Sequence, residues 1–207
     1  MLELLATKGR ADYSYATVAS FEPDRSLEGK TISTINKLKG RPATIESEAE
    51  TILQLIEAAM PAMVYHSMGM EDVERILRYP NTAVASDGGI REFGLGVPHP
   101  RSYGTNARVL AEFVRVRKTI TLEDAIRRMT SLPARTFRFR DRGLVAPGMA
   151  ADLLLFDPAR VTDKATYQQP HQYSQGFDYV LVNGVVMVDE GKLTEARGGQ
   201  VLRHRPQ

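Results

Sequence analysis

The chain has 207 residues, and its 27 Lys and Arg against 25 Asp and Glu give a formal net charge of +2. This length suits one ordinary domain, alone or with a small second one. The near-balance of charge argues against nucleic acid as a partner, because dedicated nucleic-acid binders have a strongly basic face. The chain has no cysteine, which excludes a disulfide scaffold, a thiolate zinc site and a cysteine nucleophile. It has no apolar run of the roughly 20 residues that a membrane helix needs, and no secretory signal, so we expect a cytoplasmic protein without membrane contact.

Predicted strands and helices alternate in the first part of the sequence. Strands are expected at residues 15–21, 62–68 and 82–86, and helices at 32–38, after a Thr44 cap and at 71–77. The helix after Thr44 has apolar residues on one helical stripe. They are Ile45, Ala49, Ile52, Leu53 and Ile56. The alternation of strands and helices is typical of parallel βαβ units.

The second part of the sequence changes character twice. A Gly- and Pro-rich loop is expected over residues 90–105, and helices at 107–117 and 122–130. The second helix has a capping-box-like start, Thr121-Leu-Glu-Asp124, and is expected to end near Pro133. After about residue 136 strands are expected, at 151–156, on both sides of Asn183-Gly184 and at 201–203. The sequence therefore predicts a βα array followed by a small β unit.

Asp87 is the first candidate for chemistry. It directly follows the predicted strand 82–86, and in parallel βα folds catalytic groups gather at the ends of strands. Gly88 and Gly89 allow the backbone to turn sharply beside the carboxylate. Asp-Gly is also common in ordinary turns, so a catalytic group and a turn residue are both compatible with this pattern.

A second candidate is the loop Pro98-His-Pro-Arg-Ser-Tyr-Gly104. Its prolines restrict the backbone, so the side chains of His99, Arg101 and Tyr103 could be held ready for a ligand. The guanidinium of Arg101 offers two parallel donors to a carboxylate. A solvated surface loop with an ordinary ion pair is the alternative interpretation.

The histidines show no metal-binding spacing. They are His66, His99, His171 and His204. His66 lies on a predicted strand, where a hydrogen-bonded core histidine is more common than a ligand. Arg138, Arg140 and Arg142 alternate with phenylalanines, which more often pack a helix end than stack on bases.

Several motifs occur in a characteristic order. They are Ser86-Asp-Gly88, His99-Pro-Arg-Ser-Tyr-Gly-Thr105, Leu122-Glu-Asp-Ala-Ile-Arg-Arg-Met-Thr-Ser-Leu-Pro-Ala134, Asp141-Arg-Gly-Leu-Val-Ala-Pro-Gly-Met-Ala-Ala-Asp152, Phe156-Asp-Pro158, Pro170-His-Gln-Tyr173 and Val182-Asn-Gly184. This order resembles the C-terminal part of the D-aminoacylase (N-acyl-D-amino-acid deacylase) family of the amidohydrolase superfamily. The resemblance is dense from about Tyr65 onward and thinner before it.

The resemblance implies an α/β fold: the C-terminal part of a (β/α)₈ TIM-type barrel over residues 1–135, followed by part of a small β-sandwich over residues 136–207. It also implies a zinc-dependent hydrolase that cleaves N-acyl-D-amino acids, as its small-molecule partners, to a carboxylate and a D-amino acid. Zinc-bound hydroxide would attack the amide carbonyl at neutral pH.

The resemblance also implies roles for single residues. Asp87 matches the aspartate beside the metal that acts as general base and then acid. Arg101 matches the arginine that binds the substrate α-carboxylate, and His99 in the same loop is assigned to substrate binding. Tyr65 and Met68 match a pair that borders the acyl or side-chain pocket. These two would face opposite sides of one strand, so one of them is expected beyond the strand end.

The chain departs from the family in its metal ligands. The family's H-x-H, its cysteine and its middle-strand histidines are missing, whereas a catalytic zinc needs about three protein ligands. Only Asp87 matches one. We therefore expect an N-terminally truncated fragment whose remaining zinc ligands lie in the missing part. The isolated chain is expected to be inactive and to associate through uncovered barrel edges.

Two alternatives remain open. The chain could come from another amidohydrolase, such as a dihydroorotase- or hydantoinase-like cyclic amidase, although Arg101 favours a linear acyl amino acid. It could also be a non-catalytic structural remnant that binds a partner.

Overall fold

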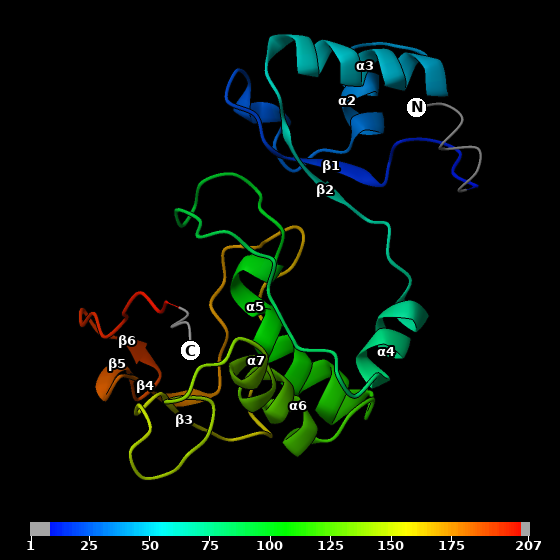
Figure 1. Cartoon of the computed structure of the whole chain (residues 1–207). Helices are drawn as coiled ribbons and strands as arrows, with labels where there is room; N and C mark the ends of the chain where they lie inside the picture. Colours follow the sequence, from blue (N-terminus) through cyan, green and yellow to red (C-terminus); the bar gives the residue numbers. More distant parts are fainter. Residues whose placement is uncertain (1–8, 204–207) are drawn as a thin grey trace. The chain divides into compact units, whose positions relative to one another are not determined.

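The computed structural model describes residues 9–203, which form two compact units (Figure 1). The first unit comprises the chain up to residue 68, residues 88–102 and residues 166–171. The second comprises residues 69–87, residues 103–165 and the chain from residue 172 onward. Each unit therefore combines segments that are far apart in the sequence.

The first unit contains a two-stranded sheet and two packed helices. Its elements are β1 (Ala16–Ser20), the 3₁₀ turn η1 (Arg25–Leu27), α2 (Ile32–Leu38), α3 (Ile45–Ala58) and β2 (Ala62–Tyr65). The predicted Thr44 cap is confirmed, because its side chain accepts a hydrogen bond from the Ser47 backbone N–H. The two helices and β1 thus form where local sequence signals place them, whereas β2 ends at Tyr65 and not at residue 68 as predicted.

β1 and β2 run antiparallel, with Ala16 opposite Tyr65. The prediction of parallel βαβ units is therefore wrong for this pair. A single crossover helix returns the chain to the end of the sheet where the first strand began, and the next strand is then parallel. Here two helices in contact with each other, α2 and α3, lie between the strands. The chain between β1 and β2 is therefore not the single-helix crossover that joins parallel strands.

The core of the first unit lies between this sheet and the helices. It consists of Tyr13, Ala16, Val18, Phe21, Ile32, Ile35 and Leu55. The predicted apolar stripe of α3 is partly wrong, since Leu53 is 55% exposed and Ile56 42% exposed. A polar strip of α3 is buried instead, because Thr51 donates to the Asn36 side chain over 2.8 Å and Glu48 accepts the Tyr13 backbone N–H over 2.7 Å.

The second unit is mainly helical. Its helices are α4 (Met70–Arg78), the continuation of α5 (Arg101–Arg108), the π-helix η2 (Val109–Val116), α6 (Leu122–Met129) and α7 (Ser131–Thr136). The capping start of α6 is confirmed, because the Asp124 N–H donates to the Thr121 hydroxyl over 3.2 Å. α6 ends at Met129, so the predicted helix over residues 122–130 is confirmed, but Pro133 is followed by further helix, because α7 begins at Ser131. Pro133 lies in the first turn of α7, where its missing N–H has no helical partner to lose.

Residues 82–86 do not form a strand in the described part of the chain, so this prediction is wrong. A strand needs a hydrogen-bonded neighbour, and the segment bonds to a helix instead: the Val84 N–H donates to the Arg128 carbonyl over 3.2 Å. The Val84 side chain packs on an apolar cluster. Its buried members are Ala107, Val109, Leu110, Ala125 and Val161.

A four-stranded antiparallel sheet completes the second unit. Its strands, in spatial order, are β3 (Leu153–Phe156), β4 (Phe177–Val182), β5 (Val185–Asp189) and β6 (Lys192–Leu193). The predicted Asn183-Gly184 hairpin is confirmed, and both residues have the positive φ, 51° and 80°, that its tight turn requires. Residues 201–203 form no strand, contrary to prediction, and β6 occupies the sheet edge.

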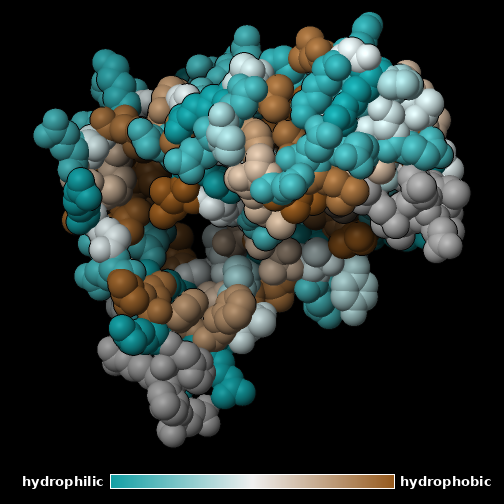
Figure 2. Space-filling view, turned by 90° about the horizontal axis from the view of Figure 1, so that it is seen from above, coloured by the Kyte–Doolittle hydropathy of each residue, from teal (hydrophilic) through white to brown (hydrophobic). Residues whose placement is uncertain are grey.

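The surface of the described residues includes many apolar side chains (Figure 2). The most exposed are Ile90, Val145, Val201, Met60 and Met68. None of the helices that residues 9–203 form is long and apolar enough to cross a bilayer.

Candidate functional site

Asp87 lies at a sharp backbone turn. Its φ of 47° is in the left-handed region, which few residues other than glycine adopt, although aspartate tolerates it better than most. The residue is exposed to solvent. Backbone strain of this kind is concentrated at functional sites, where the surrounding structure holds it in place. Lys118, Arg138, Asn183 and Glu190 also have a positive φ, so the conformation of Asp87 is compatible both with a functional carboxylate and with a turn residue.

The residue after Asp87 packs against the residue after Arg101. A Cβ added to Gly88 would lie 2.9 Å from Ser102 Cα and 3.2 Å from Ser102 N, which only a glycine avoids. Gly88 and Ser102, both in the first unit, therefore pack closely against each other. Each of these two residues directly follows a predicted site residue.

Arg101 is the first residue of α5, so the predicted loop over residues 90–105 ends earlier than expected. The helix begins here because His99 caps it: its Nδ1 accepts the Arg101 N–H over 3.0 Å, and its carbonyl accepts the Ser102 N–H over 3.1 Å. Arg101 is exposed, and it occupies the first position of α5, the end at which a helix dipole is positive. This arrangement suits an anionic group of a ligand.

His99 is fixed at both ring nitrogens. Since Nδ1 accepts a backbone N–H, Nε2 carries the proton in the neutral ring and donates to the Tyr167 hydroxyl at 3.2 Å. The ring of Tyr167 also makes edge contacts with His99 and His66, at centroid distances of 5.0 and 4.4 Å. The predicted substrate-binding residue His99 thus has a second partner, Tyr167, which sequence reasoning missed.

His171 anchors the loop that leads to His99. Its Nδ1 accepts the Gly94 N–H over 3.2 Å, and its Nε2 donates to the Gly96 carbonyl over 2.9 Å. Residues 166–171 therefore belong beside residues 88–102, although the sequence suggested a loop of the β unit. The only signal for this placement was the Pro170-His-Gln-Tyr173 motif, which carried no spatial information.

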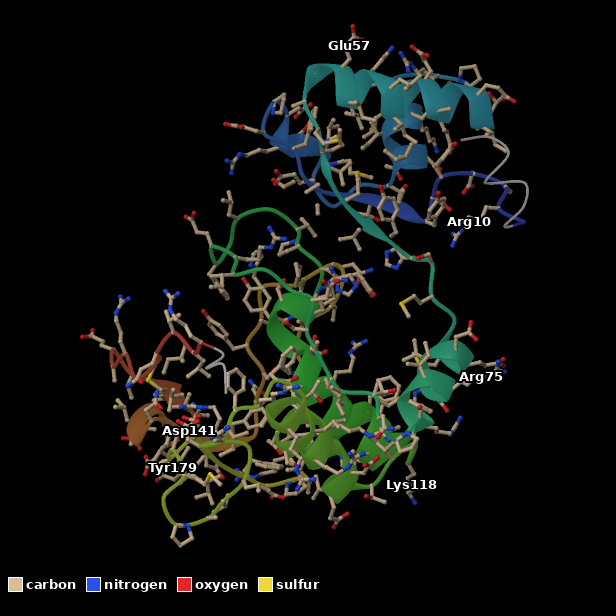
Figure 3. The ribbon with its side chains drawn as sticks, in the orientation of Figure 1. Arg10, Glu57, Arg75, Lys118, Asp141 and Tyr179 are labelled. Carbon is tan, nitrogen blue, oxygen red and sulfur yellow. The ribbon has the colours of Figure 1, made fainter. Side chains whose placement is uncertain are left out.

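Tyr65 is the last residue of β2, and Met68 lies beyond the strand, as predicted. Both are exposed, Tyr65 by 56% and Met68 by 74%. Arg10 secures this strand end (Figure 3), because its guanidinium donates to the His66 carbonyl over 3.0 Å and lies 3.9 Å from the Tyr15 ring centroid. Both side chains are therefore accessible to solvent.

Asp87 has no complete metal site around it. Among residues 9–203, no group of three or more His, Cys, Asp or Glu side chains could hold a metal ion. A catalytic zinc needs about three protein ligands, so the described residues do not fit a zinc ion by themselves.

Gly104, at the end of the His-Pro-Arg motif, has a packing role. A Cβ at this position would lie 1.8 Å from Oδ1 of Asp163. Asp163 is held there by Arg108, which donates over 2.9 Å, and by the Ala165 N–H, also at 2.9 Å. The glycine is therefore required because α5 and this carboxylate approach closely.

We expect Gly104→Ala to destabilise the second unit. The methyl group would displace Asp163 and break both of its hydrogen bonds, at a cost of about 2–4 kcal/mol. Thermal unfolding checks this, with a fall in midpoint of about 2–4 °C per kcal/mol. Gly199→Ala is the matched control, because nothing lies within 4 Å of its Cβ position. Equal midpoints for the two variants would contradict the packing argument.

Comparison with known proteins places the chain in a class of hydrolases. Residues 81–188, more than half of the chain, match the family model described as amidohydrolase family. The chain therefore belongs to the amidohydrolase family. Among curated proteins it is 41% identical to N-acyl-D-aspartate deacylase of Alcaligenes xylosoxydans xylosoxydans, over 90% of this chain and 39% of that protein. It is 34% identical to D-aminoacylase of the same organism, over 87% of this chain and 35% of that protein.

Solved structures give the same result. The crystal structure of a D-aminoacylase matches with a TM-score of 0.80 and 33% identity, over 90% of this chain and 37% of that one. N-acyl-D-glutamate deacylase from Bordetella bronchiseptica, complexed with zinc and a phosphonate mimic of the tetrahedral intermediate, matches with a TM-score of 0.77 and 34% identity, over 98% and 39% of the two chains. The chain thus spans about two fifths of the length of the relatives it matches.

Proposed function

We propose that this chain supplies part of the active site of a zinc-dependent N-acyl-D-amino-acid deacylase. The observation that carries the proposal is the meeting of Gly88 and Ser102, which brings together the turn after Asp87 and the helix start at Arg101. A general base and a carboxylate-binding group are the two functions that hydrolysis of an acyl amino acid demands near one another. The relatives that hydrolyse N-acyl-D-amino acids support this substrate class.

In this proposal Asp87 moves the proton. Its carboxylate would take a proton from the attacking water and return it to the leaving amine. Arg101 would hold the substrate α-carboxylate, with His99 keeping the helix start in place and contacting the substrate. Tyr65 and Met68 would border the acyl or side-chain pocket.

Zinc would supply the activated water when bound. The described residues contribute one matched ligand, Asp87, and the others would come from outside residues 9–203. We propose that residues 1–135 form the C-terminal part of a (β/α)₈ barrel and that residues 136–207 form part of a β-sandwich. A cyclic amidase is the second candidate, although the guanidinium of Arg101 at a helix start favours a substrate with a free carboxylate.

The function can be tested in two preparations. In the first, the 207-residue chain alone is expected to bind little zinc and not to hydrolyse N-acetyl-D-methionine, because it lacks a three-ligand site. Zinc content, sedimentation and hydrolysis are measured, and association is expected through apolar surface such as that around Ile90 and Met60. A monomer with stoichiometric zinc and turnover would contradict the ligand count.

In the second preparation, this chain replaces the matched region of N-acyl-D-aspartate deacylase, and the product is called the chimera. The chimera is expected to bind zinc and to hydrolyse N-acetyl-D-amino acids but not hydantoin or dihydroorotate. Hydrolysis of the cyclic amides alone would replace the deacylase proposal with the cyclic amidase.

A further inference from the structure

Arg128, on α6, is the largest of the fully buried side chains in the described residues, with an exposed fraction of 1%. Its Nε and Nη2 both lie 2.7 Å from Oδ2 of Asp124, one turn earlier on the same helix. Its Nη1 donates to the Tyr79 carbonyl over 2.7 Å and lies 3.4 Å from the Thr82 carbonyl. The guanidinium therefore joins α6 to the chain segment 79–84.

The same segment is held at its far end. The Val84 N–H donates to the backbone carbonyl of Arg128, and the Val84 side chain packs on the apolar cluster of the unit. The Thr82 hydroxyl donates to the Ile76 carbonyl over 2.9 Å. Arg128 thus contacts this segment through both its side chain and its main chain, and the segment then runs from Val84 directly to Asp87.

Burial of a guanidinium needs a reason. A buried ion pair does not by itself stabilise a fold, since desolvation offsets the attraction between the charges, and an apolar side chain of similar size fills a core as well. The five N–H donors of arginine can satisfy carbonyls that have no sheet partner. Residues 79–84 are such a segment, because they form no strand in the part of the chain that the structure describes. The hydrogen bond from Arg128 also lowers the pKa of Asp124, which keeps the partner carboxylate charged.

We propose that Arg128 is the positioning residue for Asp87. By holding the carbonyls of Tyr79 and Thr82 and the N–H of Val84, it sets the direction in which the backbone reaches the left-handed turn at Asp87. Its effect on catalysis rests on the function proposed above for Asp87, whereas its effect on the backbone does not.

Arg127 provides a matched comparison. Its guanidinium bonds to the other oxygen of the Asp124 carboxylate, at 2.9 and 2.8 Å, and to the Pro80 carbonyl. Its side chain is 37% exposed, however, and water can replace its bonds. Loss of Arg127 leaves the bonds to Tyr79, Thr82 and Val84 in place, so it should leave the turn at Asp87 unchanged.

The test compares Arg128→Lys and Arg128→Met with Arg127→Lys and Arg127→Met in the full 207-residue chain. Amide hydrogen exchange at Val84 reports the segment, and the backbone scalar coupling and carbon chemical shifts of Asp87 report its φ. Both Arg128 variants should raise the exchange rate at Val84 at least about tenfold and move the Asp87 signals towards extended values, because the segment opens locally. The Arg127 variants should stay within about twofold of the parent rate.

Two results would overturn the proposal. The first is Arg128→Lys with parental exchange at Val84 and a parental φ at Asp87. The second is loss of protection throughout the unit, Leu110 included, or loss of folding in both Arg128 variants, because either would make Arg128 a residue of general stability.

Activity of the chimera separates this inference from the proposed function. Arg128→Lys should lower kcat by about 10²-fold with KM unchanged, the loss expected from a small displacement of a catalytic group, and should cause no further loss when Asp87 is already Asn. If Asp87→Asn leaves turnover intact, the proposed function fails and the exchange result still decides the backbone role. If Asp87→Asn abolishes turnover but Arg128→Lys retains parental kcat, the positioning role fails alone.

Discussion

Asp87→Asn is expected to lower kcat for hydrolysis of N-acetyl-D-amino acids by the chimera about 10²–10⁴-fold. Asparagine has the shape of aspartate and also tolerates the left-handed φ of 47°, so the turn should persist. The amide cannot accept a proton from water, so the general base is lost. KM should change little, because the substrate carboxylate is assigned to Arg101. Steady-state kinetics at saturating substrate measure the effect.

Glu57→Gln is the matched control for this substitution. It makes the same change from carboxylate to amide at an exposed position near the end of α3 (Figure 3). It should leave kcat and the thermal midpoint at parental values. If Asp87→Asn has the parental kcat and the parental zinc content, Asp87 takes no part in the reaction. A fall in kcat accompanied by loss of zinc would assign the residue to metal binding rather than to proton transfer.

Features that depend on neighbouring residues could be predicted from the sequence. Thr44 and Thr121 cap their helices, and Asn183-Gly184 makes the hairpin turn, because each signal acts within a few residues. The direction of β2 could not be predicted in this way. It depends on tertiary packing, and the contact between α2 and α3 includes a buried polar pair, Asn36 and Thr51, which a search for apolar stripes ignores.

The segment before Asp87 shows the same limit. Thr82-Ala-Val-Ala-Ser86 has the composition of a strand, but composition does not reveal whether a hydrogen-bonded neighbour is present. In the described residues the carbonyl of Thr82 and that of Tyr79, just before the segment, are met by the side chain of Arg128, which lies 46 and 49 positions further along the chain. A buried arginine cannot be distinguished from a solvated one by sequence pattern alone, since most arginines are exposed.

The candidate site divides in a similar manner. Asp87 and Arg101 could be identified as candidates from the sequence, because each lies in a short motif that contains charged side chains. Tyr167 and His171 were missed as partners of that loop, because their contacts join positions that are far apart in the sequence. Residues such as these hold a loop in place through contacts between distant positions of the chain, and such contacts are visible only in the folded structure.

Arg101→Lys is expected to lower kcat/KM of the chimera for N-acetyl-D-amino acids about 10–100-fold. Lysine retains the charge at the start of α5 but loses the planar pair of donors that grips a carboxylate. A hydrogen bond to a charged group is worth about 1.5–3 kcal/mol, and each 1.4 kcal/mol is about tenfold in affinity, which gives this range. The fall in kcat/KM should be smaller for substrates whose α-carboxylate is amidated, because they have no carboxylate to accept the two parallel N–H donors of the guanidinium.

Arg75→Lys serves as the control, since it makes the same exchange on the exposed face of α4 (Figure 3). It should leave kcat/KM unchanged for both substrates. The comparison of free and amidated substrates is the decisive measurement, because a change in the fold lowers activity towards both alike. If Arg101→Lys lowers kcat/KM equally for the free and the amidated substrate, Arg101 does not bind the substrate α-carboxylate. If only the substrate with the free carboxylate is affected, the α-carboxylate binds at the start of α5, where His99 caps the helix.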